Sequence, residues 1–494
     1  MISDCVWAQS NYQLLPSPIN IQGSDEFFPS LSANGRVMLY QAPLGDLGES
    51  KYAISYQKNG VWSSPAIIPQ INSEVKNLNS NGHFLSYDAN QIFFSSAKYG
   101  GIGGMDIWMC YKNGSSWTNP VNIASPINSI ANEVDPCMSA DGRYLFFTRL
   151  IPGQKTKTGA PCGKIYFSKK VSKSSWAQPQ LLSQPINTGC ECNLRILPDQ
   201  QTITFASERK GGKGGYDQYL SSWNDDGTWT NPKAIDQVCT ANDDLYISIP
   251  AGGDYVYYTA EIKKSKDIVR SLLTQEQKPY KTLIINSKFI NSPANAEFKP
   301  SVVIYENSLS YLIYPNQSNN YFIALNQNDK VEVVYQADYK KYLPQIERYQ
   351  LDTLTKYYEL NTQINLTSIK KDAIYYFSKY PKIANYAEEL KNELSVLARL
   401  MKENIDFRFQ IEYFSPSIDT LISKITDQEI NILNEKINIA KEDANILKKF
   451  FVEKYFIPET QILIQPTEKI YVKTPKCSFY QKNTEEQVLY LKVL

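Results

Sequence analysis

The stretch Tyr99–Trp108, YGGIGGMDIW, has the composition of a loop that does chemistry. Four glycines followed by Asp106 suit a phosphate cradle, a calcium loop or a tight turn. A phosphate cradle should occur once, before a helix, and should end in Lys followed by Ser or Thr. Here a strand-like pattern follows, and a second copy at Lys210–Tyr219 is too distant for calcium-binding repeats that stack in tandem. We therefore predict a structural turn.

Two other residue types that carry chemistry are scarce or poorly placed. His83 is the only histidine, and a Ser-His-Asp or Cys-His arrangement would need it. It follows Asn-Gly at a position that Arg36 and Arg143 take in related segments, so we expect a surface turn residue. Eight cysteines permit disulfides without requiring them, and Cys190-Glu191-Cys192 is too tightly spaced for a zinc knuckle. We expect no metal and no cofactor.

The elements that would position these residues recur along the first two thirds of the chain. A tryptophan recurs about every 55 residues, at Trp7, Trp62, Trp117, Trp176 and Trp229. In most copies a proline follows it, and each copy then reaches an Ile or an Ile-Asn pair. In phase with it, Glu26–Arg36 (EFFPSLSANGR) matches Glu133–Arg143 closely. Looser copies begin at Leu78, Glu191, Asp243 and Glu297. Each copy is an apolar run, a turn of Asn-Gly or Asp-Gly type and a second apolar run, which is typical of a β-hairpin.

Six such units, with four short strands each, predict a six-bladed β-propeller over residues 7–335. The Glu-x-x-Pro-x-x-Ser-x-Asp/Asn-Gly-Arg and Gly-Gly-x-Gly-Gly-x-Asp elements resemble the WD40-like repeats of TolB-type propellers. The resemblance implies blades around a central channel. Residues 7–20 are expected to close the ring by supplying a strand to the last blade.

Acids that repeat in phase are the candidates for binding residues at the mouth of this channel: Glu26, Glu133, Glu191 and Glu297. Propellers can build glycosidase sites from acids on different blades. Repetition at one position instead favours a shared structural role at the start of each inner strand. We therefore expect that the chain is not an enzyme.

The second part of the chain has a different character, because glycine is absent beyond residue 335. Apolar residues follow the helical period at positions 387, 390, 394, 397, 398 and 401, and again at 430, 433, 437, 440, 444, 447 and 451. Strands are expected at 374–377, 407–413, 462–464 and 488–493. The order β-α-β-α-β-β predicts a two-layer α/β sandwich over residues 372–494. Residues 336–371 read as an ordered connection, partly helical.

This order resembles the OmpA-like (Pal-like) domain that binds peptidoglycan. Ala444-x-x-Leu447-x-x-Phe450-Phe451 falls where that family has Ala-x-x-Val-x-x-Tyr-Leu. The family grips diaminopimelate with Thr-Asp after the central strand and with an arginine just before the alanine. Here these positions hold Ser415-Pro416 and Asp443. Proline offers no acceptor and Asp443 would repel the ligand's carboxylate, so the resemblance implies a degenerate site. A helix alignment shifted by one turn is the alternative.

The whole-chain charge gives no support for a polyanionic partner. Lys and Arg number 51 against 50 Asp and Glu, so we expect neither nucleic acid nor an anionic membrane to be bound. No run of 18 apolar residues occurs, so no transmembrane segment is expected. Peripheral association with the outer membrane does not require such a segment and stays open. The start, MISDCVWAQ, is not a complete signal peptide, although Val6-Trp7-Ala8 has the form of the end of one.

These features together predict a non-enzymatic scaffold of the Gram-negative cell envelope, periplasmic or associated with the outer membrane, that binds protein partners. The resemblances extend this to secretion, gliding or other trans-envelope complexes. Two alternatives stay open: a peptidoglycan anchor that still binds the cell wall, and a propeller that hydrolyses glycans.

Overall fold

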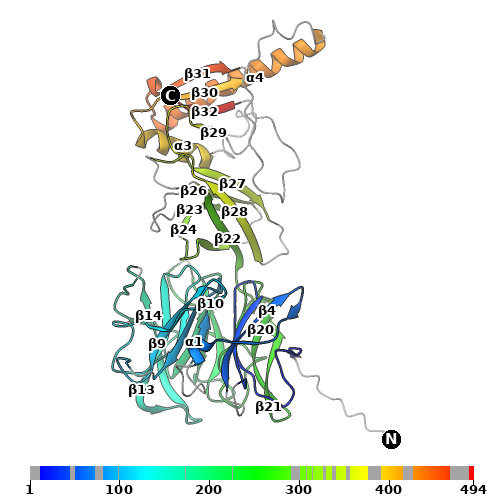
Figure 1. Cartoon of the computed structure of the whole chain (residues 1–494). Helices are drawn as coiled ribbons and strands as arrows, with labels where there is room; N and C mark the ends of the chain where they lie inside the picture. Colours follow the sequence, from blue (N-terminus) through cyan, green and yellow to red (C-terminus); the bar gives the residue numbers. More distant parts are fainter. Residues whose placement is uncertain are drawn as a thin grey trace. The chain divides into compact units, whose positions relative to one another are not determined.

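The computed structural model divides the chain into two compact units (Figure 1). Unit 1 comprises Met1–Ile284, Asn316–Gln327 and Leu354–Glu359, and unit 2 comprises Ile285–Pro315, Asn328–Thr353 and Leu360–Leu494. The described residues are 12–44, 50–72, 82–97, 100–172, 174–224, 226–290, 301–306, 309–313, 315–325, 330–336, 341–351, 357–376, 391–414, 427–467 and 489–494.

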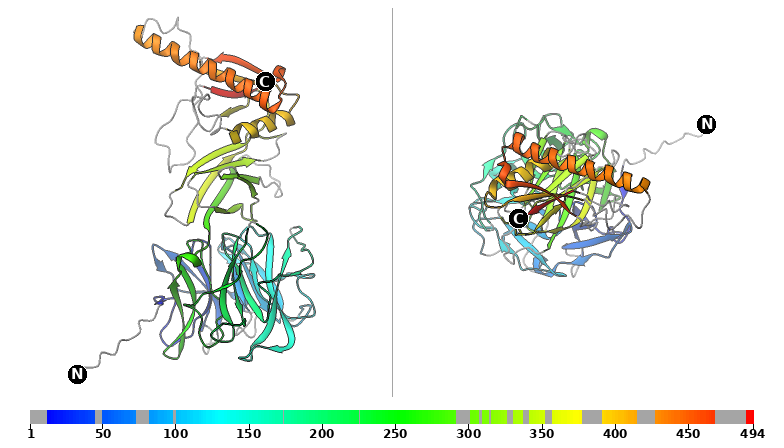
Figure 2. Two further views of the ribbon diagram at one scale, coloured as in Figure 1. Left: turned by 180° about the vertical axis from the view of Figure 1, so that it is seen from behind. Right: turned by 90° about the horizontal axis from the view of Figure 1, so that it is seen from above.

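Unit 1 contains, within its described residues, five antiparallel sheets that stand around a common axis (Figure 1, and Figure 2, right, from above). Blade 1 is β2 (Phe27–Leu31), β3 (Val37–Ala42), β4 (Lys51–Lys58), β5 (Val61–Trp62) and β6 (Ala66–Ile67), followed by α1 (Pro69–Asn72). Blade 2 is β7 (His83–Leu85), β8 (Gln91–Ser96), β9 (Asp106–Asn113), β10 (Ser116–Trp117) and β11 (Val121–Asn122). Blade 3 is β12 (Glu133–Met138), β13 (Tyr144–Lys155), β14 (Pro161–Lys169) and β15 (Gln180–Leu181).

The ring is completed by two more blades, the second of which joins both ends of the domain. Blade 4 is β16 (Glu191–Ile196), β17 (Thr202–Ser207), β18 (Asp217–Ser222) and β19 (Lys233–Ala234). Blade 5 is β20 (Tyr255–Ile262), β21 (Ser265–Leu272) and β1 (Gln13–Leu14). A bridge from Ser248 to Tyr257 supplies its inner edge. Because β1 pairs antiparallel with β21, the expectation that the N-terminal fragment completes the last blade is confirmed.

The predicted number of six blades is wrong. The copy that begins at residue 297 does form a hairpin, β23 (Ser301–Glu306) with β24 (Leu309–Ile313), but β23 pairs on its other side with β26 (Lys330–Gln336). The physical reason is that β1 already covers the outer edge of blade 5, and blade 5 packs against blade 1 through Tyr257 and Leu31. A closed ring has no place for a further blade.

The recurring Pro-Ile-Asn has a structural task that explains its repetition. The side chain of Asn128 accepts a hydrogen bond from Ile107 N (2.8 Å) and donates one to Ile107 O (2.9 Å). Asparagines at the same position act alike on the third strands of the other blades: Asn20 on Ile268, Asn72 on Tyr52 and Asn187 on Ile165. Each side-chain amide therefore makes the two hydrogen bonds that one more backbone residue of the short outer strand would make. Blade 4 has Cys239 at this position.

Two sheets follow the propeller strands along the chain. One has the order β25 (Asn320–Leu325), β22 (Lys281–Ile290), β28 (Tyr357–Asn365), and the other is β24-β23-β26-β27, with β27 at Gln345–Gln350. Residues 336–371, expected to be partly helical, therefore contribute strands where they are described. Their alternating tyrosine-rich sequence suits a pleated, half-buried surface.

The C-terminal part of unit 2 has the predicted element order. It consists of β29 (Ile374–Tyr376), α3 (Lys391–Glu403), β30 (Phe409–Phe414), α4 (Asp427–Tyr455), β31 (Ile462–Thr467) and β32 (Leu489–Val493). The sheet order is β29-β32-β30-β31, with β30 and β31 parallel. The predicted stripes are buried where side chains are described, with Leu394, Leu397 and Met401 on α3 packing in one core with Ala444 and Leu447 on α4.

Candidate functional site

The glycine-rich loop of the opening motif is a structural turn. Asp106 begins β9, and its carboxylate accepts hydrogen bonds from the backbone N–H of Ile102 (2.5 Å) and Gly103 (3.2 Å). A Cβ at Gly103 would lie 2.2 Å from Ser129 O, so only glycine fits against the neighbouring loop. The sister loop in blade 4 is closed in the same way, by Asp217 and Gly214 N (3.1 Å).

The repeated glutamates fix the loops that precede the inner strands. Glu133 accepts hydrogen bonds from Ser129 N (3.1 Å) and pairs with Arg149 Nε at 2.7 Å. Glu191 accepts from Thr188 N (3.0 Å) and pairs with Lys164 Nζ at 3.1 Å. Both carboxylates are fully buried in their own blades. Glu297 lies outside the described residues.

Glu26 is the member of this set that has no cation. Its side chain is fully buried, and among the described residues neither carboxylate oxygen has a hydrogen-bond partner of good geometry, although the backbone of Ile21 lies near enough to lower the pKa of the carboxyl. The register of β2 with β3 places Ala42 where blade 3 has Arg149. Burial raises the pKa of Glu26 to about 7, and the nearby carboxylates of Asp267 and Asp25 contribute to this shift.

The axis of the propeller is lined by one residue from each blade in the same unusual conformation. These residues are Phe28 (φ 58°), Gly82 (56°), Asp135 (54°), Asn193 (53°) and Tyr246 (59°). In blades 1, 3 and 4 the register shifts at this point, which marks a β-bulge. The rings of Phe28 and Tyr246 are 4.2 Å apart, and Tyr246 N donates to Asn193 Oδ1 at 2.6 Å. Side chains therefore fill the centre of the ring at this level.

His83 is buried, which corrects the expectation of a surface turn residue. It begins β7, is 1% exposed and lies edge-on to the ring of Tyr52 at 5.1 Å. The preceding Asn-Gly looked like a hairpin turn, but Gly82 lies close against Asp135, since a Cβ there would be 2.4 Å from the Asp135 carboxylate. Burial, reinforced by the charge of Arg195, lowers the pKa of His83 to about 3, so this imidazole stays neutral.

Arg195 occupies the next level of the axis. Its guanidinium donates to His83 O (2.6 Å) and Pro136 O (3.2 Å) and lies over the ring of Phe84. Tyr87 adds a further link across the axis, because its hydroxyl donates to Ile196 O at 2.6 Å. No sequence pattern predicted this arrangement, because the repeat positions of Arg195 and Tyr87 hold other residue types, such as Cys137 and Ala140, in the other copies. The interior at this level is a packed core and not an open channel.

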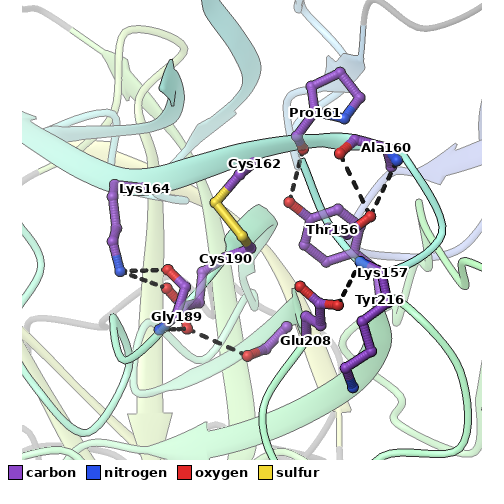
Figure 3. Close-up of a disulfide and its surroundings, with 12 residues drawn as sticks. Thr156, Lys157, Ala160, Pro161, Cys162, Lys164, Gly189, Cys190, Glu208 and Tyr216 are labelled. Atoms are coloured by element: carbon purple, nitrogen blue, oxygen red, sulfur yellow. Dashed lines mark hydrogen bonds and ion pairs between the residues drawn. A yellow bond between two sulfur atoms is a disulfide. The ribbon is translucent and has the colours of Figure 1, made fainter. Parts of the chain in front are cut away.

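The long hairpin of blade 3 reaches across blade 4 and is fastened by a disulfide (Figure 3). Cys162 on β14 is bonded to Cys190, which immediately precedes β16. Tyr216 holds the hairpin through a hydrogen bond to Pro161 O (2.8 Å), and Glu208 accepts one from Lys157 N (2.6 Å). We call residues 150–161 the strap.

The opposite side of the propeller contacts a later segment of unit 1. Asp88, in the turn between β7 and β8, accepts hydrogen bonds from Asn316 Nδ2 (3.1 Å) and Ser318 Oγ (2.7 Å). Gln200, in the corresponding turn of blade 4, donates to Phe322 O at 2.9 Å. Phe322 is 1% exposed and belongs to the same hydrophobic core as the blades. This segment therefore occupies the axis on that side.

The predicted positions of the degenerate peptidoglycan site are only partly described. Ser415 and Pro416 lie outside the described residues. Asp443 is on α4 and is 4% exposed. The described polar network of unit 2 lies elsewhere: Arg348 on β27 pairs with Glu332 (2.7 Å) and with Glu393 of α3 (3.2 Å). Glu393 also accepts a hydrogen bond from Tyr375 at 2.8 Å.

The described residues of unit 1 form five sheets arranged as the blades of a closed β-propeller, and further β and α/β layers follow along the chain. No family model matches the sequence, and no curated protein does. Among solved structures, TolB from Acinetobacter baumannii is similar, with 13% identity, 52% of this chain and 55% of that chain covered, and a TM-score of 0.32. A putative TolB from Agrobacterium tumefaciens has 12% identity, coverage of 70% and 88%, and a TM-score of 0.31.

The similar solved structures also include enzymes, and this finding corrects the expectation that the chain is not an enzyme. An endo-arabinase from Bacteroides thetaiotaomicron VPI-5482 is 14% identical, with 54% of this chain and 100% of that chain covered and a TM-score of 0.36. An α-L-arabinofuranosidase from Lactobacillus brevis is 12% identical, with coverage of 53% and 95% and a TM-score of 0.36. At this level of similarity the likeness assigns no activity to this chain.

Proposed function

We propose that this chain is a protein-binding component of the Gram-negative cell envelope. The disulfide between Cys162 and Cys190 supports an extracytoplasmic location, because such bonds persist in oxidising compartments such as the periplasm. None of the described helices is long and apolar enough to cross a membrane. A role in a secretion, gliding or other trans-envelope complex is the finer form of this proposal.

The observation that carries the proposal is the outer rim of the propeller. Leu14, Ile67 and Leu181 occupy one equivalent position on the outermost strands of blades 5, 1 and 3. Their exposed fractions are 53%, 43% and 50%. The axis is filled, so the rim offers the repeated apolar surface from which a protein interface can be built. Asn122 takes the equivalent position in blade 2 and breaks this pattern.

The C-terminal sandwich is proposed to be an OmpA-like domain that has lost its peptidoglycan ligand. This rests on the β-α-β-α-β-β order and on Asp443 at the position of the family's arginine. A buried carboxylate there would repel the carboxylate of diaminopimelate. Sedimentation of the full chain with purified sacculi tests this point. Retention on the sacculi would restore the alternative of a peptidoglycan anchor.

The protein-binding role is tested by site-specific photo-crosslinking in the cells that produce the protein. A photoreactive amino acid at Ile67 or at Leu181 should give a discrete crosslinked protein, whereas one at Asn122 should give little. The matched positions share the same strand geometry, so accessibility alone cannot produce the difference. Equal labelling from all three positions, or no crosslinked protein from any, would contradict the proposal.

A further inference from the structure

One face of the propeller carries a concentration of lysines. We call it the basal face: on this face the inner strands begin, and turns connect the second strand of each blade to the third. Six exposed lysines stand on these turns in three successive blades: Lys155 and Lys157 before β14, Lys210 and Lys213 before β18, and Lys263 and Lys264 before β21. We refer to these six residues as the lysine crown.

Two of the three turns of the crown are neighbours in space, and the strap extends from them to the loop before blade 5. The strap carries Lys157 onto blade 4, where its backbone N–H donates to Glu208. The next residue, Thr158, reaches blade 5 and donates to Asp243 at 2.9 Å. Lys213 is half exposed and lies 3.9 Å from the Asp236 carboxylate. The turns of blades 3 and 4 therefore lie side by side, and the strap also reaches the loop that leads into blade 5, with the carboxylates of Glu208, Asp236 and Asp243 among these lysines.

The turn between β20 and β21 keeps its lysines at a conformational cost. Lys263 has φ of 49° and Lys264 has φ of 75°, a region that glycine and asparagine occupy far more readily. Such residues cost on the order of 1 kcal/mol each. Two exposed lysines in the positions that favour Asn-Gly indicate that their charge has a use beyond folding.

Burial explains how a nearly neutral chain acquires a basic surface. Eight carboxylate residues are buried among the described residues of unit 1: Glu26, Asp106, Glu133, Asp135, Glu191, Asp199, Asp217 and Asp267. The buried Lys and Arg residues of the same described part are Arg195 and Lys281. Most of these carboxylates accept hydrogen bonds from backbone N–H groups or form ion pairs with cationic side chains inside the propeller. The lysines that offset the charge of these acids in the whole-chain count lie on the protein surface.

Two isoleucines project from the same face. Ile130, in the loop before β12, is 91% exposed, and Ile102, in the glycine-rich turn before β9, is 47% exposed. The two loops touch, since a Cβ at Gly103 would lie 3.0 Å from Ile130 C. An almost fully exposed isoleucine is costly in water and gains free energy when it enters an apolar phase.

We propose that the basal face docks onto a bilayer surface that contains anionic phospholipids. The lysine crown would lie on the headgroups, and Ile102 and Ile130 would enter the acyl boundary. Basic residues beside exposed aliphatic side chains are the features that bind interfacial proteins to anionic lipids. An acidic protein partner is less well matched, because lysine is depleted in protein interfaces, and the crown contains neither arginine nor an aromatic anchor.

The test uses the full chain and flotation with vesicles of two compositions. Vesicles of phosphatidylcholine with about a third phosphatidylglycerol should bind the protein, and pure phosphatidylcholine vesicles should not. A triple variant removes one lysine charge from each of the three blades that carry the crown: Lys157→Gln, Lys210→Gln and Lys264→Gln. At about fivefold per lysine, its partition coefficient should fall about a hundredfold. Binding should also be lost in 0.5 M NaCl, because salt screens exposed charges.

The matched control removes exposed lysines that lie at the far ends of third strands, Lys58→Gln and Lys169→Gln, and should bind as the wild type does. Ile130→Ser should weaken binding while leaving its salt dependence intact. Equal binding to both vesicle types, no binding to either, or an equal loss in the control would overturn the proposal. Tighter binding to poly-L-glutamate than to anionic vesicles would also overturn it, in favour of an acidic protein partner. Unchanged thermal unfolding of each variant excludes misfolding as the cause.

Discussion

Replacing Glu26 by glutamine should stabilise the propeller, and only at neutral and alkaline pH. Glu26 is fully buried, has no cation beside it among the described residues, and receives from the backbone of Ile21 a contact that offsets only part of the effect of burial on its pKa. The same position in blades 3 and 4 is neutralised by Arg149 and Lys164. Glutamine has almost the same shape and carries no charge, so the substitution removes the cost of ionising a buried group.

The magnitude follows from the pKa of the carboxyl, which rises from 4.5 to about 7 on folding. Because the folded state holds its proton more tightly, the group's stabilising contribution is complete below pH 4.5. It is lost as the pH rises through 7. A shift of about 2.5 units corresponds to about 3 kcal/mol. At pH 8 the variant should therefore exceed the wild type in unfolding free energy by about 3 kcal/mol, and near pH 4.5 the two should be about equal.

Urea unfolding followed by tryptophan fluorescence measures this directly, since all seven tryptophans precede residue 230 and report on unit 1. Subtracting the wild-type unfolding free energy from that of the variant cancels the contributions of the titrating groups that both proteins share. Glu133→Gln is the control: it breaks the pair with Arg149 and should destabilise the propeller at neutral pH. A Glu26→Gln protein that is no more stable at pH 8, or whose gain does not change with pH, would refute the reasoning.

Three further predictions test other parts of the fold. Asn128→Ala leaves the backbone groups of Ile107 without partners and should lower the unfolding free energy by about 2 kcal/mol or more; a loss below about 0.5 kcal/mol would contradict the clamp. Cys162→Ser should cost about 3 kcal/mol, and dithiothreitol should destabilise the wild type but not the variant. Arg348→Met removes the arginine that pairs with two buried carboxylates and should destabilise unit 2 by about 3–5 kcal/mol, seen by circular dichroism, while the tryptophan signal of unit 1 stays unchanged.

Local patterns predicted the elements well. The hairpin motif located the inner strands of blades 1 and 3 because Asn34-Gly35 and Asp141-Gly142 stand at turns that require positive φ. The helical stripes located α3 and α4 because burial on a helix has a fixed period. The N-terminal fragment was recognised because it repeats the outer part of a blade.

What the sequence could not supply is which elements lie together. The hairpin at residue 301 has the correct local signal, but its sheet partner, β26, is set by long-range packing. Gly82 looked like a turn because glycine is also chosen where two backbones approach closely. The net charge likewise carries no spatial information: a count of ionisable residues does not show that carboxylates such as Glu133 and Glu191 lie inside the blades.

The pairing of β1 with β21 has a consequence for how the protein is made. Gln13 and Arg270 are 257 positions apart, and their side chains are joined by a hydrogen bond of 3.1 Å. During synthesis or export, the first strand must wait until nearly all of unit 1 has emerged. Until then β1 has no strand partner, and its backbone groups are open to chaperones, to proteases and to pairing with other chains.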